Sequence, residues 1–277
     1  MRPVVALLTD FGTEDHYVGA VKGAILTVCP DVNLVDVVHG LPPHDVVAGA
    51  FALAAAYRFF PAGTVFLAVV DPGVGSPRRA LALEAAGYRF VGPDNGLFTF
   101  LLRDARPARV HEITNAGLFR FEVSATFHAR DVFGPVAGHL ARGLALEDVG
   151  PALAEPVLLR DEPTRRLGPE EWQTSVLHVD RFGNLITHLH RDELRSILAE
   201  LEEDLLGMAA VVEGIVVPLA RTYADVPEGE ACALVGGSGR LEVAVNRGNA
   251  SRLLGASRGA PIRLRRALPA GESGPMA

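Results

Sequence analysis

The sequence of 277 residues is poor in cysteine and in long apolar runs, and each scarcity excludes a class of protein. Its two cysteines, Cys29 and Cys232, lie far apart in apolar stretches, which fits neither a metal-binding spacing nor a disulfide framework. We therefore predict two buried, reduced thiols. No apolar run reaches the roughly 18 residues of a membrane span, and the first run, at 4–8, is too short for a signal peptide. We expect a cytoplasmic protein that has no membrane partner.

Positive charge is also scarce. Lysine and arginine total 26 against 33 aspartates and glutamates, and Lys22 is the one lysine, which we interpret as a compositional bias. Nucleic-acid binding needs clustered cations, so the net charge of −7 argues against nucleic acid as a partner. Hydrophobic residues make up 49% of the chain, which is enough for the core of one large domain or of two ordinary ones.

The first half of the chain alternates strand-like and helix-like segments. In chain order these are strand 4–8, helix 17–28, strand 34–38, helix 45–57 and strand 64–70. Asp45 is placed to cap the second helix. Strands that are buried on both faces and separated by helices are typical of a mainly parallel sheet. We therefore predict an N-terminal α/β domain over residues 1–155.

The pattern changes near prolines that lie among charged residues between Pro151 and Pro169, which indicates a domain boundary. We place a linker at 156–168, a C-terminal domain at 169–268 and a frayed tail at 269–277. Short β-type runs separated by glycine and proline predict a small β-barrel or sandwich, with one helix near 192–206. The runs lie at 174–179, 209–217, 231–235, 241–245 and 261–264.

Two carboxylates follow strands at the edge where parallel sheets bind ligands: Asp10 after the first strand and Asp71 after the third. Either one alone can cap a helix or close a turn, but together they predict one site. Asp71 opens the stretch Asp-Pro-Gly-Val-Gly, and Arg78 follows it. Glycine allows a ligand to approach the backbone, and a nearby arginine keeps a carboxylate ionised. An ordinary turn with surface arginines is the alternative, since neither a phosphate-binding loop nor a dinucleotide fingerprint is completed.

Three further segments carry polar chemistry. His128, beside an arginine and an aspartate, can begin a helix or hydrogen-bond a reacting water. In the segment 180–184, Phe182 can stack on a base, and the amide of Asn184 can donate and accept as adenine recognition requires. A glycine-rich turn at 236–239 leads into a strand whose backbone can read a base edge.

Several of these motifs, in this order, resemble the S-adenosylmethionine hydroxide adenosyltransferases, which are related to the halide-using fluorinase and chlorinase. The resemblance implies an N-terminal α/β domain, a C-terminal β-barrel and a homotrimer with active sites between subunits. It also implies hydrolysis of S-adenosyl-L-methionine (SAM) to adenosine and L-methionine, a small-molecule substrate, without metal or cofactor. The matching segments extend over nearly the whole chain and lie at 7–12, 17–20, 71–75, 91–97, 127–131, 180–184 and 253–255.

By the same resemblance, Asp71, Arg78 and His128 are the catalytic residues that handle the water. Asp10 is expected to hold the ribose hydroxyls. The adenine and the rest of the substrate are assigned to the C-terminal domain. There the resemblance implies contacts by Asp180, Phe182, Asn184, Ser238, Glu242 and the backbone around Val245 and Arg247.

The halide enzymes lack the aspartate–arginine–histidine set, which places this chain with the hydrolases. It departs from the family pattern at Ala129, where glycine is common, at Arg240, where an aromatic is common, and at His188, where asparagine is common. Three alternatives remain open. They are a halide-dependent, chlorinase-like SAM lyase, a non-catalytic adenosine-binding module, and a metal hydrolase built on His188 and His190, which share one strand face.

Overall fold

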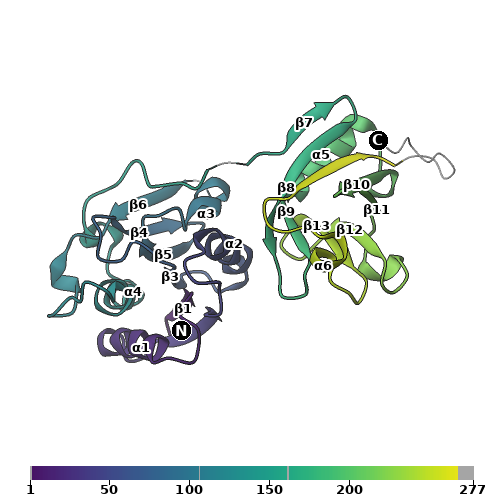
Figure 1. The fold of residues 1–277 in the computed structure, drawn as a ribbon. Coiled ribbons are helices and arrows are strands. Elements are labelled where there is room, and N and C mark those ends of the chain that lie inside the picture. The colour runs from purple at the N-terminus through teal and green to yellow at the C-terminus, as the bar shows by residue number, and fades with distance from the viewer. Residues whose placement is uncertain (1, 106, 161, 268–277) are drawn as a thin grey trace. The chain divides into compact units, whose positions relative to one another are not determined.

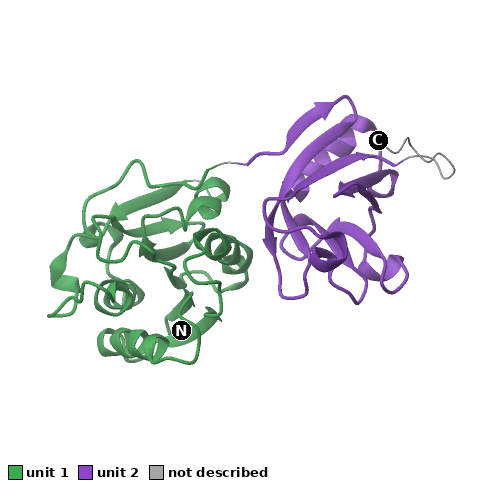
Figure 2. Cartoon of the chain, in the orientation of Figure 1, with its two compact units in different colours: residues 1–160 green, residues 161–277 purple. Residues whose placement is uncertain are grey.

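The computed structural model describes residues 2–105, 107–160 and 162–267, and the chain divides into two compact units (Figure 1). Unit 1 spans Met1–Arg160 and unit 2 spans Asp161–Ala277 (Figure 2). The division falls inside the segment 156–168 that the proline pattern predicts as a linker. The tail predicted at 269–277 lies outside the described residues.

Unit 1 is built on a mainly parallel sheet, as the apolar runs predict. Its strands are β1 (Val4–Thr9), β2 (Asn33–Val38), β3 (Val65–Val69), β4 (Ala80–Ala85), β5 (Tyr88–Pro93) and β6 (Ala108–Glu112). They lie in the order β2-β1-β3-β5-β4-β6. β1, β2, β3 and β5 run parallel, whereas β4 is antiparallel to both of its neighbours. The carboxyl ends of β1 and β3 therefore lie side by side.

Helices cover both faces of this sheet, with α1 and α4 on one side and α2 and α3 on the other (Figure 1). The helices and single turns are α1 (Tyr17–Val28), α2 (Val46–Ala56), η1 (Tyr57–Phe59), α3 (Thr99–Asp104), η2 (Ala116–Leu118), the π-helical η3 (Ala129–Phe133), α4 (Gly134–Ala141) and η4 (Leu146–Val149). Ile25 and Phe133 are fully buried in the core that α1, η3 and α4 form against β1 and β3. As predicted, the Asp45 side chain caps α2, accepting a 3.0 Å hydrogen bond from the Ala48 N–H.

Unit 2 is a nearly closed antiparallel barrel, which confirms the predicted fold class. The order is β11-β10-β14-β8-β9-β13-β12, with β7 beside β8, and a bridge between Leu219 and Ala233 joins the two edges. Two helices and two single turns accompany the strands. The elements are β7 (Arg165–Gly168), β8 (Glu171–Val179), β9 (Leu185–His190), α5 (Arg191–Leu201), η5 (Leu205–Gly207), β10 (Met208–Val212), β11 (Ile215–Pro218), η6 (Tyr223–Asp225), β12 (Ala231–Val235), β13 (Arg240–Val245), α6 (Ala250–Leu254) and β14 (Pro261–Arg266).

The structure corrects two boundaries. The run 209–217, predicted as one strand, is the hairpin of β10 and β11, because Glu213 and Gly214 adopt positive φ angles of 47° and 79° and reverse the chain. The helix predicted near 192–206 ends at Leu201, because Glu202 adopts a left-handed conformation. Cys29 and Cys232 are buried and free, as predicted. Within the described residues, no helix is both long and apolar enough to cross a membrane.

Candidate active site

A cavity of about 520 Å³ opens in unit 1 at the edge where β1 and β3 end. Asp10 and Asp71 both line it, because parallel neighbouring strands deliver the residues that follow them to the same edge of the sheet. The opposite wall comes from the chain before and inside η3, including Ser124, His128 and Arg130. Segments that lie more than fifty residues apart in the sequence thus form a single hollow.

Asp71, Arg78 and His128 form a continuous chain of hydrogen bonds at this cavity. The Arg78 guanidinium donates to Asp71 through Nε at 2.9 Å and through Nη2 at 2.5 Å, and both side chains of this ion pair are largely buried. Nη2 of Arg78 also lies 3.0 Å from Nδ1 of His128. This arrangement contradicts the alternative of a turn with surface arginines as far as Arg78 is concerned.

The contact with Arg78 decides the tautomer of His128. A guanidinium has donors only, so Nδ1 of His128 accepts, and a neutral ring carries its proton on Nε2. Burial lowers the pKa of His128 below its ordinary value, and the charge of Arg78 lowers it further, against smaller opposing effects of Asp71 and Asp131. His128 is therefore neutral at neutral pH and can donate a hydrogen bond from Nε2.

The glycine-rich turn after Asp71 explains how the two loops approach each other. The Val74 N–H donates to the Asp71 carbonyl at 3.2 Å, and the Ser76 N–H donates to the Gly73 carbonyl at 3.1 Å. Gly75 has a φ of +78°, and a Cβ atom added there would lie 2.4 Å from the carbonyl oxygen of Ala125. A side chain at position 75 would thus push away the loop that leads to His128.

Asp10 is held by the backbone of a second loop and does not cap a helix. Its Oδ2 accepts a 2.7 Å hydrogen bond from the N–H of His44, which has a positive φ of 66°. The preceding hydroxyl, of Thr9, lies 2.8 Å from Nδ1 of the buried His39 and accepts from the Phe11 N–H. These contacts fix the turn that aims the Asp10 carboxylate.

Aromatic side chains that the sequence analysis did not single out line the same cavity. Phe11, Tyr17 and Phe127 meet edge to face, with ring centroids 5.4–6.1 Å apart. The guanidinium of Arg130 lies 4.9 Å from the centroid of Phe127. Phe11 and Phe127 come from loops and Tyr17 is the first residue of α1, so hydrophobic periodicity carried no signal that the three rings would meet.

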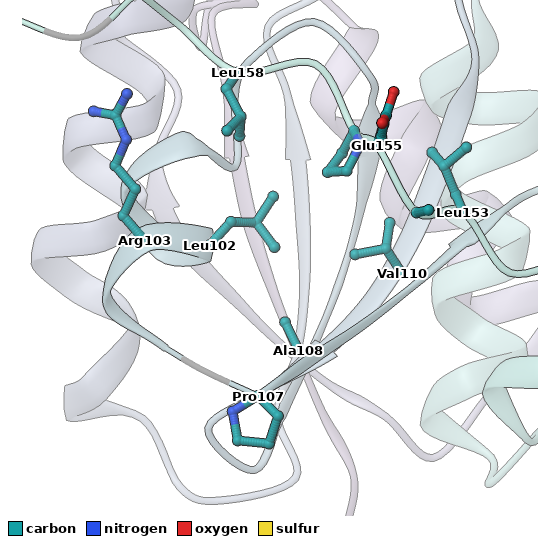
Figure 3. A pocket seen from close by; sticks show the side chains of 10 residues that line it. Leu102, Arg103, Pro107, Ala108, Val110, Leu153, Glu155 and Leu158 are labelled. Carbon is teal, nitrogen blue, oxygen red and sulfur yellow. The ribbon is translucent and has the colours of Figure 1, made fainter.

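A further cavity in unit 1, of about 600 Å³, shares no residue with this one. It lies between the end of α3, the start of β6 and residues 153–158, and the side chains of Leu102, Val110 and Leu158 line it (Figure 3). This second cavity opens at the amino end of β6, and its lining is mainly aliphatic. Its lining residues do not include a set of acid, base and cation like that of Asp71, His128 and Arg78.

In unit 2, Asp180 organises the loop that carries the predicted adenine-binding residues. Its Oδ1 accepts from the N–H groups of Phe182 and Asn184, both at 2.9 Å, and its Oδ2 accepts from Nδ2 of Asn184 at 3.0 Å. The Phe182 ring is left 74% exposed at the tip of the loop. One N–H of the Asn184 amide is thus committed to Asp180, so its oxygen and its second N–H remain for recognition.

Ser238 lies in the glycine-rich turn before β13, and Glu242 lies in β13 itself. Glu242 is only 4% exposed and accepts a 2.5 Å hydrogen bond from the Tyr223 hydroxyl. Burial raises the pKa of Glu242, and burial together with Glu242 raises the pKa of Tyr223. Oγ of Ser238 is buried and has no hydrogen-bond partner among the described residues. Tyr223 was missed because a tyrosine in a loop has no distinguishing pattern.

The remaining predicted residues lie near the ends of β13 and β9. Val245 is buried at the end of β13, whereas Arg247 has a positive φ of 55° and points its side chain to Glu228. Nη1 of Arg240 donates to the backbone carbonyl of His188, so two positions that depart from the family pattern contact each other. Within the described part of the chain, no three His, Cys, Asp or Glu side chains gather as metal ligands.

Together these features define a two-unit protein whose α/β unit carries a carboxylate–arginine–histidine set and whose β-barrel unit presents an exposed aromatic ring beside an amide. Residues 5–150 match the SAM hydroxide adenosyltransferase N-terminal domain, and residues 174–263 match the SAM hydroxide adenosyltransferase C-terminal domain. The chain therefore belongs to the SAM hydroxide adenosyltransferase family, as its motifs predict.

Individual relatives agree with this assignment. The chain is 44% identical over 275 residues to an (R)-S-adenosyl-L-methionine hydrolase of Thermus thermophilus, covering 95% of this chain and 100% of that protein. It is 29% identical to a fluorinase of Actinopolyspora mzabensis, over 96% of this chain and 98% of that one. The crystal structure of an uncharacterized conserved protein from Thermotoga maritima superposes with a TM-score of 0.87 at 35% identity, covering 95% of this chain and 100% of that chain.

Proposed function

We propose that this protein hydrolyses S-adenosyl-L-methionine to adenosine and L-methionine. The observation that carries the proposal is the hydrogen-bonded chain of Asp71, Arg78 and His128 in the wall of a cavity that also holds Asp10. Membership of the SAM hydroxide adenosyltransferase family and the name of the Thermus relative support it. The fluorinase relatives are more distant, at 29–31% identity.

In this reaction the oxygen of water attacks C5′ of the ribose, and the C5′–S bond breaks with its electron pair passing to sulfur. The sulfonium becomes the neutral thioether of methionine, so the leaving group needs no acid. The water loses one proton, which passes to solvent through the Asp71 carboxylate. His128 donates from Nε2 to the water oxygen, while Arg78 holds both partners in place. A cavity with little water favours attack on the cation, because hydration of the reactants is removed.

The remaining substrate contacts follow from the same proposal. Asp10 holds the ribose hydroxyls, since its carboxylate is fixed by the His44 N–H and faces the cavity. Phe182 stacks on the adenine, and the Asn184 oxygen accepts from its amino group. Asp180, Ser238 and Glu242 contact the rest of the substrate, with backbone groups around Val245 and Arg247 on the base edge. The active site forms between subunits of a homotrimer.

The names of the hydrolase relatives specify the (R) configuration at sulfur, so we assign the (R) epimer as the preferred substrate. Purified protein incubated with each epimer separately in ¹⁸O-water is expected to release methionine faster from the (R) form. The label is expected at the 5′-oxygen of adenosine, as mass spectrometry can detect. Unlabelled adenosine, or no methionine release from either epimer, would overturn the proposed reaction.

The same assay distinguishes the other candidate activities. When the buffer without halide is replaced by one rich in chloride, we expect no 5′-chloro-5′-deoxyadenosine. A halide-dependent lyase would produce that compound. Activity is expected to persist in the presence of a chelator, because no metal takes part in the proposed step. A non-catalytic adenosine-binding module would bind adenosine tightly and leave the substrate intact over hours.

Phe182→Ala is expected to weaken adenosine binding by about 1–3 kcal/mol, the usual contribution of stacking between a base and an aromatic ring. The free energy of unfolding should change little, because the ring is 74% exposed. Calorimetric titration with adenosine and thermal unfolding measure the two effects. Phe59→Ala is the matched control, since that ring in unit 1 is 81% exposed and should leave adenosine affinity unchanged. Equal affinity in Phe182→Ala and wild type would remove the ring from the adenine site.

A further inference from the structure

Asp131 is a fully buried carboxylate that the proposed reaction does not use. Its side chain is 0% exposed, although it lies in η3, only three residues after His128. Arg130 binds it in a bidentate manner, with Nε and Nη2 each 2.7 Å from a carboxylate oxygen. The Ser124 N–H donates to Oδ2 at 3.0 Å, and Nε of Arg120 lies 3.3 Å from Oδ1.

These partners belong to the wall of the cavity or to the loop behind it. Ser124 and Arg130 line the cavity on either side of His128 in the sequence. The backbone repeats the connection, because the Arg120 N–H donates to the Asp131 carbonyl at 2.9 Å and the Asp131 N–H donates to the Phe127 carbonyl at 3.2 Å. Asp131 therefore ties together both ends of the loop that carries His128.

The carboxylate also balances charge beside the cavity. Two guanidinium groups, those of Arg130 and Arg120, face Asp131, and Arg130 extends over the ring of Phe127 into the cavity wall. A substrate with a positively charged sulfur is repelled by an uncompensated arginine in that wall. With Asp131 ionised, one of these two positive charges is cancelled, and Arg130 and Asp131 form a neutral pair in the wall around His128.

From this geometry we infer that Asp131 is a positioning residue for the reaction. It holds the loop of residues 120–127 and the Arg130 guanidinium so that His128 faces Arg78 and the cavity accepts a sulfonium. The inference deepens the proposed function and rests on it. Asp131 itself touches no reacting atom, because its carboxylate is enclosed by its own partners.

The test compares wild type with Asp131→Asn, which keeps the shape and removes the charge. We expect kcat/KM for the sulfonium substrate to fall roughly 10- to 100-fold, as displaced catalytic loops typically cause. KM for the cationic substrate should rise more than the inhibition constant of S-adenosylhomocysteine, the neutral thioether analogue. Only the positively charged sulfur is repelled by the unbalanced arginines. If Asp131 had a purely structural role, the variant would weaken the binding of both ligands equally.

The pH profile supplies a second readout. His128 faces Arg78 and Asp71 across the cavity and Asp131 on its own segment, with Asp10 and Arg130 also in the cavity wall. Activity requires a neutral ring whose Nδ1 accepts from Arg78, so it is lost as the pH falls through the pKa of His128. Asp131 raises that pKa, so its neutralisation should move the acid limb of kcat/KM to lower pH. The charge-balanced double variant Arg130→Gln/Asp131→Asn should return the limb towards wild type.

Two controls make each outcome decisive. Arg109→Gln removes a guanidinium that forms exposed ion pairs with Glu84 and Glu147 in the same unit. This variant should leave kcat and KM unchanged. If Asp131→Asn does not fold, Arg120→Gln removes one of the two cationic partners and makes the wall less positive, so the opposite shift, a lower KM relative to the thioether inhibition constant, is expected. Unaltered kinetics and pH profile in folded Asp131→Asn overturn the inference. Absence of hydrolysis by wild type overturns the proposed function instead.

Discussion

Asp71→Asn is expected to lower kcat by about 10²–10⁴, the range typical for loss of acid–base assistance, while adenosine affinity stays close to that of wild type. The neutral amide can neither accept the proton of the attacking water nor hold Arg78 by charge. Arg78 would then be free to turn away from Nδ1 of His128, which it meets at 3.0 Å. Stopped-time measurement of methionine release, together with calorimetric titration of adenosine, checks both parts. His128→Ala and Arg78→Ala should give losses of similar size.

Loss of a buried ion pair also costs stability, so the catalytic effect needs a matched comparison. Asp94→Asn provides it, because the Asp94 side chain is also buried and pairs with Arg79, the neighbour of Arg78 in the sequence. Asp94 does not line the cavity of Asp10 and Asp71. We expect Asp94→Asn to lower the unfolding temperature without a comparable loss of kcat. Full turnover by Asp71→Asn and Asp71→Ala would refute the role of this carboxylate.

Gly75→Ala is expected to destabilise unit 1 by roughly 3 kcal/mol and to reduce kcat by at least about tenfold. The alanine would hold a φ of +78° and place its Cβ 2.4 Å from the Ala125 carbonyl oxygen. Relief of that overlap must move either the turn that carries Asp71 or the loop that carries His128. Chemical denaturation and steady-state kinetics measure the two consequences separately.

Gly63→Ala separates backbone strain from the contact between loops. Gly63 has nearly the same φ, +82°, but no atom lies within 4 Å of its added Cβ. Only the conformational penalty of about 1–2 kcal/mol is expected there, with kcat unchanged. If Gly75→Ala behaved like Gly63→Ala in both measurements, the approach of the two loops would have no bearing on catalysis.

The sheet of unit 1, and the edge of it at which Asp10 and Asp71 lie, followed from the hydrophobic pattern of the sequence. The apolar runs that became β1, β2 and β3 are separated by helices, which indicates parallel strands, and parallel strands bring Asp10 and Asp71 to one edge. The cap at Asp45 and the barrel strands at 231–235 and 241–245 followed from equally local signals. The β4, β5 and β6 strands did not, because the turn at Ala86 and Gly87 and the strands around it lack a continuous apolar run.

The roles of Asp71, Arg78 and His128 came from family resemblance, since no spacing in the sequence links residues 50 positions apart. The buried clamp at Asp131 and the pair of Tyr223 and Glu242 were invisible for the same reason. Patterns of burial depend on neighbours within a turn or a strand, so the sequence by itself determined the layers of unit 1 and the edge at which Asp10 and Asp71 lie. Only the tertiary structure decided which side chains meet there, because a hydrogen bond between two loops depends on where both strands end.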